Sequence, residues 1–129
     1  MSIEVGRALA DLLTKDEVLS AKVDDRVFPI ISHKDIAYPY IAYRRKDMKP
    51  AYTKDRDKVE DSLFVDIVVV AERYAESIEI AKDVLRILER KKGVYRGIDI
   101  SDIRLSDSEE DADEVYIQRL EFEVMINVT

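Results

Sequence analysis

The alternation of apolar residues after Ser62 predicts a strand that leads into a long helix. From Leu63 to Ala71 every odd position is apolar, and the even positions are mostly apolar apart from Asp66. Side chains alternate between the two faces of a strand, so the odd set is expected to line a core and the even set to be partly covered. β-Branched residues dominate the run, as in packed sheets. This stretch is therefore predicted to be the central strand.

The helix is expected to begin at about Tyr74, and no later than Ser77. Its apolar stripe has i, i+3 and i+4 spacing and consists of Ile78, Ala81, Val84, Leu85 and Leu88, widened by Ile80 and Ile87. The bases at 90–92 are expected to lie on the last, carbonyl-rich turn, and Gly93 to provide the left-handed stop. The stripe predicts that this helix lies on the sheet.

Two shorter helices are predicted near the start of the chain. Ser2 is expected to cap the first, whose apolar face consists of Val5, Ala8, Leu9, Leu12 and Leu13. Thr14 and Glu17 have the spacing of a capping box, which predicts a second helix that runs to about Ala21.

Two strands and a long connection are predicted between these helices and the central strand. Residues 26–31 form a short strand that Pro29 restricts to an edge or a strand end. Tyr40–Lys46 forms the next strand, held extended by the preceding Tyr38-Pro39. Residues 47–61 carry mixed charges without apolar periodicity, and this segment is expected to be a flexible arm.

The last third of the chain predicts two further strands. Alternation changes phase between Ile100 and Ile103, which indicates a bulge near Ser101-Asp102. Residues 107–114 carry six acids and no base, which predicts a solvated turn. From Val115 to Val128 the alternation is strict, as in an antiparallel strand with one side open to water or to a partner.

These elements predict a single α+β domain over residues 1–129. The sheet is expected to have about five strands, to be largely antiparallel, and to carry the long helix and the short N-terminal helices on one face. A length of 129 residues suits one core.

Composition narrows the range of functions. The formal net charge of -7 argues against binding nucleic-acid phosphates, which requires a positive surface. Cysteine is absent, which excludes disulfides and thiol chemistry. The chain shows no apolar leader and no run long enough to cross a bilayer, so we expect a soluble protein of the cytoplasm without membrane contact.

No motif in the sequence predicts catalysis, a metal or a cofactor. His33 is the only histidine, so a histidine metal site lacks partners, and we expect an exposed loop residue. The acids at 107–114 lack the glycine and the ligand spacing of a calcium-binding EF-hand loop. Asp66 and Glu72 resemble the acids of a nuclease sheet, but no lysine lies on their strand, and we attribute the pair to chance. We therefore expect a protein that is not an enzyme.

Aromatic and basic residues cluster around the second predicted strand. The aromatic members are Tyr38, Tyr40, Tyr43 and Tyr52, and the adjacent bases are Arg44, Arg45 and Lys46. Stacking on nucleic-acid bases is one interpretation. Packing at a protein interface suits an acidic chain better, and the candidate interface residues are Tyr40, Tyr43, Arg44, Arg45 and Tyr52.

The order and spacing of these elements resemble the tail completion (tail terminator) proteins of long-tailed bacteriophages. The resemblance rests on Arg26-Val27-Phe28, on Tyr38-Pro39-Tyr40-Ile41-Ala42-Tyr43, and on Asp66–Val70 followed by Tyr74-Ala75 and the amphipathic helix. It implies a non-catalytic protomer that closes into a ring, six-fold, on the head-proximal end of the tail tube. The implied partners are further copies of itself, the tail tube protein and the head connector protein, in the host cytoplasm during assembly and then in the virion tail.

The resemblance also suggests a role for the excess negative charge. A ring through which DNA passes must not hold its phosphates, so we expect acids to line or border the channel. The candidates are Asp107, Glu109, Glu110, Asp111, Asp113, Glu114, Glu121 and Glu123. The alternative functional interpretation is a small non-catalytic α+β binding or assembly module unrelated to phage.

Overall fold

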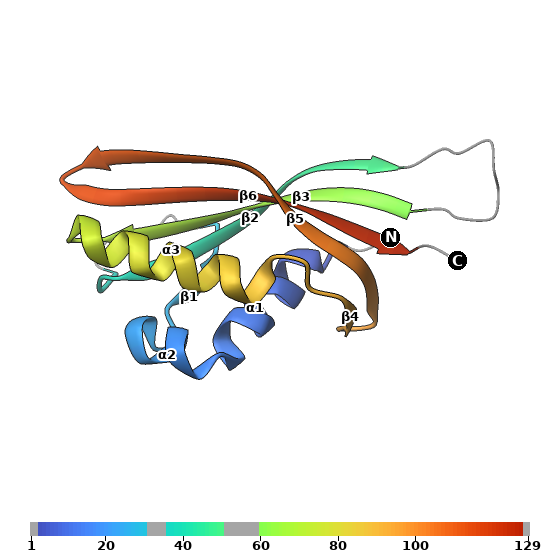
Figure 1. Cartoon of the computed structure of the whole chain (residues 1–129), viewed down its shortest axis with the longest axis horizontal. Helices are drawn as coiled ribbons and strands as arrows, with labels where there is room; N and C mark the ends of the chain where they lie inside the picture. Colours follow the sequence, from blue (N-terminus) through green and yellow to red (C-terminus); the bar gives the residue numbers. More distant parts are fainter. Residues whose placement is uncertain (1–2, 31–35, 51–59, 128–129) are drawn as a thin grey trace.

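The computed structural model of the chain describes residues 3–30, 36–50 and 60–127. There the elements follow in the order α1 (Val5–Lys15), α2 (Glu17–Val23), β1 (Val27–Pro29), β2 (Tyr40–Pro50), β3 (Glu60–Ala71), α3 (Tyr74–Leu88), β4 (Gly93–Tyr95), β5 (Ile98–Asp113) and β6 (Val115–Asn127). The helices lie on one face of the sheet, below it in Figure 1. This arrangement confirms the predicted α+β class.

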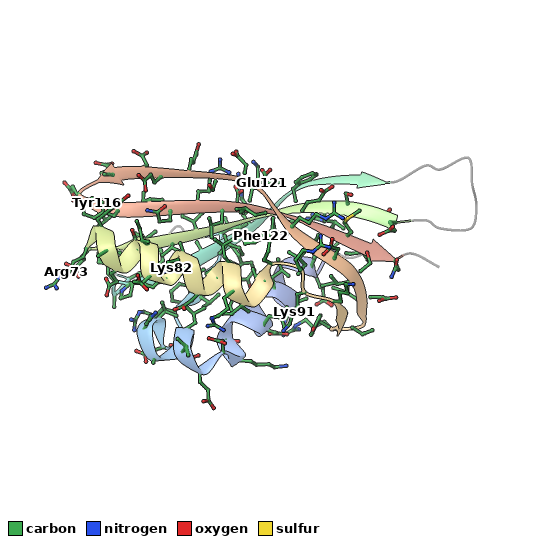
Figure 2. All side chains as sticks on the ribbon, viewed as in Figure 1. Arg73, Lys82, Lys91, Tyr116, Glu121 and Phe122 are labelled. Carbon is green, nitrogen blue, oxygen red and sulfur yellow. The ribbon has the colours of Figure 1, made fainter. Side chains whose placement is uncertain are left out.

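The core lies between the helices and the sheet, as the alternation on β3 predicts. The odd positions of β3 from Leu63 to Val69 are fully buried, as are Leu88 on α3 and Leu9 on α1. Phe122 on β6 is the largest fully buried side chain of the described residues and points to the same side (Figure 2). Burial of each large apolar side chain contributes about 1.5–3 kcal/mol before conformational entropy is counted.

The described strands form one six-stranded sheet in the order β1-β2-β3-β6-β5-β4, one strand more than the sequence predicts. Strands β1 and β2 are parallel, and the other neighbouring pairs are antiparallel. The prediction of Pro29 in an edge strand is confirmed, since β1 forms one edge of the sheet.

The additional strand, β4, begins at Gly93, where the helix was expected to stop. Helix α3 already ends at Leu88, because Glu89 turns to extended backbone with a ψ of 125° and the N–H of Arg90 donates to the carbonyl of Ile103 at 2.6 Å. The bases at 90–92 therefore follow the helix. Gly93, with a φ of +136°, begins β4 and pairs with Ile100 on β5.

The second helix begins with a different cap from the predicted one. Thr14 lies inside α1, and the side chain of Asp16 accepts a hydrogen bond from the N–H of Leu19 at 3.0 Å. This carboxylate satisfies a free N–H of the first turn, so α2 begins at Glu17 and continues to Val23. Ser2, the predicted cap of the first helix, lies outside the described residues, and Glu4 occupies the cap position without a side-chain hydrogen bond.

The prediction that the acidic segment is a turn is wrong. Strand β5 runs through it as far as Asp113, and Glu114, with a φ of 64°, turns the chain into β6. Pairing with β6 satisfies the backbone, and the side chains of this segment remain exposed as predicted. The predicted bulge is confirmed between Ile100 and Asp102, and a second register shift lies between Leu105 and Asp107.

Both ends of the predicted flexible arm belong to strands. β2 continues to Pro50 and β3 begins at Glu60, in antiparallel register. Residues 51–59, which include Tyr52, lie outside the described part of the chain, as do His33 and Val128.

Candidate interaction surface

The face of the sheet opposite the helices, called here the open face, carries alternate side chains of each long strand. On β3 these are the even positions from Phe64 to Val70, which lie opposite odd positions of β6 such as Arg119 and Glu121. Figure 2 shows Glu121 on the side away from the helices and the neighbouring Phe122 on the helix side. Because no described helix covers this face, it is available for contacts outside the protomer.

Arg119 is the centre of the open face. Its guanidinium donates to Asp66 at 3.0 Å, to Glu109 at 2.8 Å and to Asp107 at 3.3 Å, and so connects β3, β5 and β6. Asp66 is only 5% exposed. The hydrogen bond to Glu109, followed by the charge of Asp66, holds the pKa of Arg119 above its usual value although burial acts against this. The network rigidly joins three strands through charge-assisted hydrogen bonds.

A second cation on this face comes from β2. The Nζ of Lys46 donates to Glu121 at 2.6 Å and lies 4.0 Å from Asp66. The hydrogen bond from Lys46, with a further one from Ser106, lowers the pKa of Glu121, and the same ion pair raises the pKa of Lys46. A lysine therefore does lie beside Asp66, supplied by the adjacent strand and already paired.

The predicted channel acids do not share one face. Odd positions of β5 after the second bulge lie on the open face with Glu121 and Glu123, and they are Asp107, Glu109, Asp111 and Asp113. Glu110 points to the helix side, and Glu114 occupies the turn. A turn would have allowed all six to gather, whereas a strand alternates them.

Glu110 belongs to a polar and aromatic cluster at the end of the hairpin. Its carboxylate accepts hydrogen bonds from the hydroxyl of Tyr74 and from the amide of Gln118, both at 3.0 Å. The rings of Tyr74 and Tyr116 meet edge to face with centroids 5.6 Å apart. Hydrogen bonding to Glu110 raises the pKa of Tyr74. This cluster fastens the tip of the β5–β6 hairpin to the start of α3, and the sequence analysis missed it.

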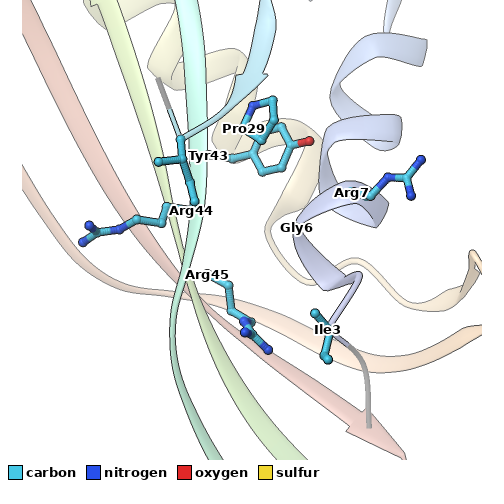
Figure 3. Close-up of a pocket in the computed structure, with 8 residues that line it drawn as sticks. Ile3, Gly6, Arg7, Pro29, Tyr43, Arg44 and Arg45 are labelled. Atoms are coloured by element: carbon cyan, nitrogen blue, oxygen red, sulfur yellow. The ribbon is translucent and has the colours of Figure 1, made fainter. Parts of the chain in front are cut away.

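The predicted interface residues also divide between the faces. Tyr40 lies on the open face, where its ring stacks on Tyr38 at 5.7 Å and meets Phe28 at 6.5 Å. Tyr43 lies on the helix side, against Gly6 of α1. Arg44 is opposite Asp66 and so on the open face, and Arg45 is on the other face (Figure 3). Together with Tyr43, both arginines line a cavity of about 340 Å³.

Catalytic and metal sites are not apparent in the part of the chain that the structure describes. No group of three or more histidine, aspartate or glutamate side chains there is arranged to hold a metal ion. Glu72 is exposed beyond the end of β3, six positions from Asp66, so those two acids are not brought together. Among the described helices, none is long and apolar enough to span a membrane.

Comparison with known proteins supplies a fold relationship. No model of a known protein family matches the chain, and no curated protein matches it. A solved structure described as the virion of a native gene transfer agent (GTA) particle contains a chain that matches with a TM-score of 0.79. The match covers 96% of this chain and 95% of that chain, at 16% sequence identity. The two chains share one fold.

A second solved structure matches less closely. Its TM-score is 0.54 at 15% identity, over 100% of this chain and 98% of the other. Both matches extend over nearly the whole chain. The chains therefore share the entire arrangement of elements from α1 to β6.

Proposed function

We propose that this protein is a structural component of a phage or prophage tail, namely the tail terminator. It forms a ring, six-fold, that caps the tail tube and joins it to the head connector. The observation that carries the proposal is the fold shared with a chain of the gene transfer agent virion over 96% of this chain. The order of elements around the Tyr38-Pro39-Tyr40 strand supports the finer assignment to the terminator.

The two unlike faces of the sheet suit a position in a ring. Helices cover one face, and no described helix covers the open face, which carries the acids Asp107, Glu109, Asp111, Asp113, Glu121 and Glu123. We assign the open face to the channel and the helices to the outside. Arg119 and Lys46, in the middle of the open face, are each bound to carboxylates, so they are not available to hold phosphates. The exposed Arg44 lies on the same face, on β2 at the side of the sheet. Asp111, Asp113 and Glu123 form no ion pair with the side chains that the structure describes. Such unpaired acids repel DNA over a Debye length, about 8 Å at physiological salt.

The role predicts two kinds of partner contact besides the ring itself. One rim of the ring meets the tail tube protein and stops its polymerisation, and the other meets the head connector protein. Assembly takes place in the host cytoplasm, and the protein then remains in the virion tail. No step in this role requires catalysis or a cofactor.

Tube-length control provides the test. The tail tube protein encoded by the same genome is polymerised with and without this protein, and tube lengths are measured by electron microscopy. We expect added protein to arrest elongation and to appear as a ring at one tube end, because a capped end presents no surface for the next tube subunit. Tubes of unchanged length without rings at their ends would contradict the proposal. Bovine serum albumin at equal concentration controls for crowding.

A further inference from the structure

The outer edge of β2 loses its partner strand halfway along its length. β1 pairs only with Ile41, Ala42 and Tyr43, and the last backbone bond on this side runs from the N–H of Ile30 to the carbonyl of Tyr43. Beyond Tyr43, no other described strand lies on that side of β2. The cavity of about 340 Å³ opens at this point, between the end of β1, β2 and the start of α1 (Figure 3). We call this cavity and its arginines the basic notch.

Two arginines of the basic notch, Arg44 and Arg45, carry positive charge that no described side chain neutralises. Arg44 and Arg45 are exposed, and neither forms an ion pair with the side chains that the structure describes, those of residues 3–30, 36–46 and 60–127. Asp66, which lies opposite Arg44 across the strand pair, is bound instead by Arg119. Arg7 on α1 also lines the notch and pairs with the exposed Glu4. The net charge of the chain is -7, so exposed arginines beside a strand edge that no described strand covers favour an acidic protein partner.

The opposite edge of the same sheet has the complementary properties. β4 covers β5 only as far as Ile100, and residues just after α3 bond to Ile103 and Leu105. From there to Asp113 no described strand pairs with the outer side of β5. On this stretch Asp111 and Asp113 are exposed and form no ion pair with the described residues, unlike Asp107 and Glu109.

We propose that the basic notch of one copy, through Arg44 on the open face, binds the acidic β5 edge of the next copy, through Asp111 and Asp113 on the same face. This inference rests on the proposed ring and names the contact that closes it. The two surfaces are different and lie on opposite edges of one sheet, so the contact is head-to-tail and repeats around a ring. β2 and β5 run in opposite directions within the sheet, so the two edges meet antiparallel.

The register gives the contact a defined stagger. Arg44 is level with Asp107 across the sheet, through Asp66 and Glu121. Bringing Arg44 to Asp111 or Asp113 of a neighbour therefore shifts the neighbour by four to six residues along the strands, roughly 13–20 Å. A stagger of this kind is what closed sheets require, because strands in a closed arrangement tilt against its axis.

Charge reversal tests the contact with the full-length protein. Variant one is R44E, variant two is D111K/D113K, and variant three combines all three substitutions. Light scattering after size exclusion measures the mass of each. We expect wild type and variant three to form rings, and variants one and two to remain monomers. An equimolar mixture of variants one and two should form rings, because each reversed surface then meets its complement.

The controls separate failure of this inference from failure of the proposed function. R73E/K82E reverses two exposed bases at the start and on the outer side of α3 and should leave the ring intact. Thermal unfolding followed by circular dichroism checks that each variant is folded. Rings in wild type and in both variants would overturn this contact and leave the terminator role standing. Absence of rings in wild type would overturn both this contact and the proposed function. If variants one and two do not form rings, and neither their mixture nor variant three forms rings again, the direct pairing is overturned.

Discussion

The guanidinium of Arg119 on β6 lies 3.0 Å from the carboxylate of Asp66 on β3, at the middle of the open face. Asp66 is the one charged residue in an otherwise apolar run, and it is 5% exposed. Its burial is tolerated because Arg119 donates to it directly and Lys46 lies at 4.0 Å.

The first prediction concerns this pair. Arg119→Leu should lower the free energy of unfolding by about 1–3 kcal/mol, because it leaves a buried carboxylate without its main hydrogen-bond donor. The double variant Asp66→Leu/Arg119→Leu should recover part of the loss, since no buried charge then remains. Urea unfolding of the two single variants and the double variant measures the coupling. Strictly additive losses would show that the two residues do not interact.

The second prediction concerns the cap of α2. Hydrogen bonds from Arg86 and from the N–H of Leu19 lower the pKa of Asp16 from 3.8 to about 2. A folded-state pKa below the unfolded value contributes stability above the unfolded pKa, and that contribution disappears as the pH falls through the folded pKa. The stability from Asp16 should therefore be complete at neutral pH and be lost between about pH 4 and pH 2.

Asp16→Asn isolates the charge in this test, because asparagine caps helices about as well as aspartate. We expect it to lower the free energy of unfolding by about 0.5–1 kcal/mol at pH 7, the size of a partly exposed ion pair. The difference from wild type should shrink toward zero as the pH approaches 2. A difference that stays constant across this range would mean that the carboxylate charge of Asp16 contributes nothing.

The third prediction concerns the end of the hairpin. Tyr116→Ala removes the edge-to-face contact with Tyr74, which is worth about 0.5–1.5 kcal/mol beyond the buried area. Amide hydrogen exchange near Asp113 should accelerate, while exchange around Phe122 should not change, because local opening does not require global unfolding. Tyr116→Phe keeps the ring and serves as the control. Equal acceleration at both places would indicate global destabilisation instead of a local anchor.

The fourth prediction concerns the proposed channel. Glu121→Lys/Glu123→Lys changes the sign of two charges on the open face, and both residues lie on the inner strand β6 and not on the β2 and β5 edges of the proposed contact. Particles with this variant should assemble but eject DNA more slowly, most clearly at low salt, because screening weakens at low ionic strength. Glu76→Lys/Glu79→Lys on α3 adds the same charge to the helix side and should not slow ejection. Normal ejection at low salt by the open-face variant would remove that face from the channel.

The sequence alone determined the elements whose pattern is local. The alternation of β3 and β6, the stripe of α3 and the phase change at the bulge each reflect side chains a few residues apart, and each was found where predicted. Hydrophobic periodicity is sufficient for these because burying one face of an element dictates its spacing. The same patterns predicted the α+β class and the placing of helices on one face.

Tertiary structure decided what depends on partners that are distant in the chain. Asp16 caps α2 and also binds Arg86, 70 residues away, whereas the local spacing favoured Thr14. The acidic segment becomes a strand because β6 pairs with it and Arg119 binds two of its acids. The prediction of a turn considered only the charges within the segment and not these distant partners. Arg119 itself reaches Asp66 across 53 residues. The free-energy cost of burying a charge, or of placing like charges together, depends on the residues that the fold brings beside them. Those residues are distant in the chain, so the local sequence pattern does not identify them.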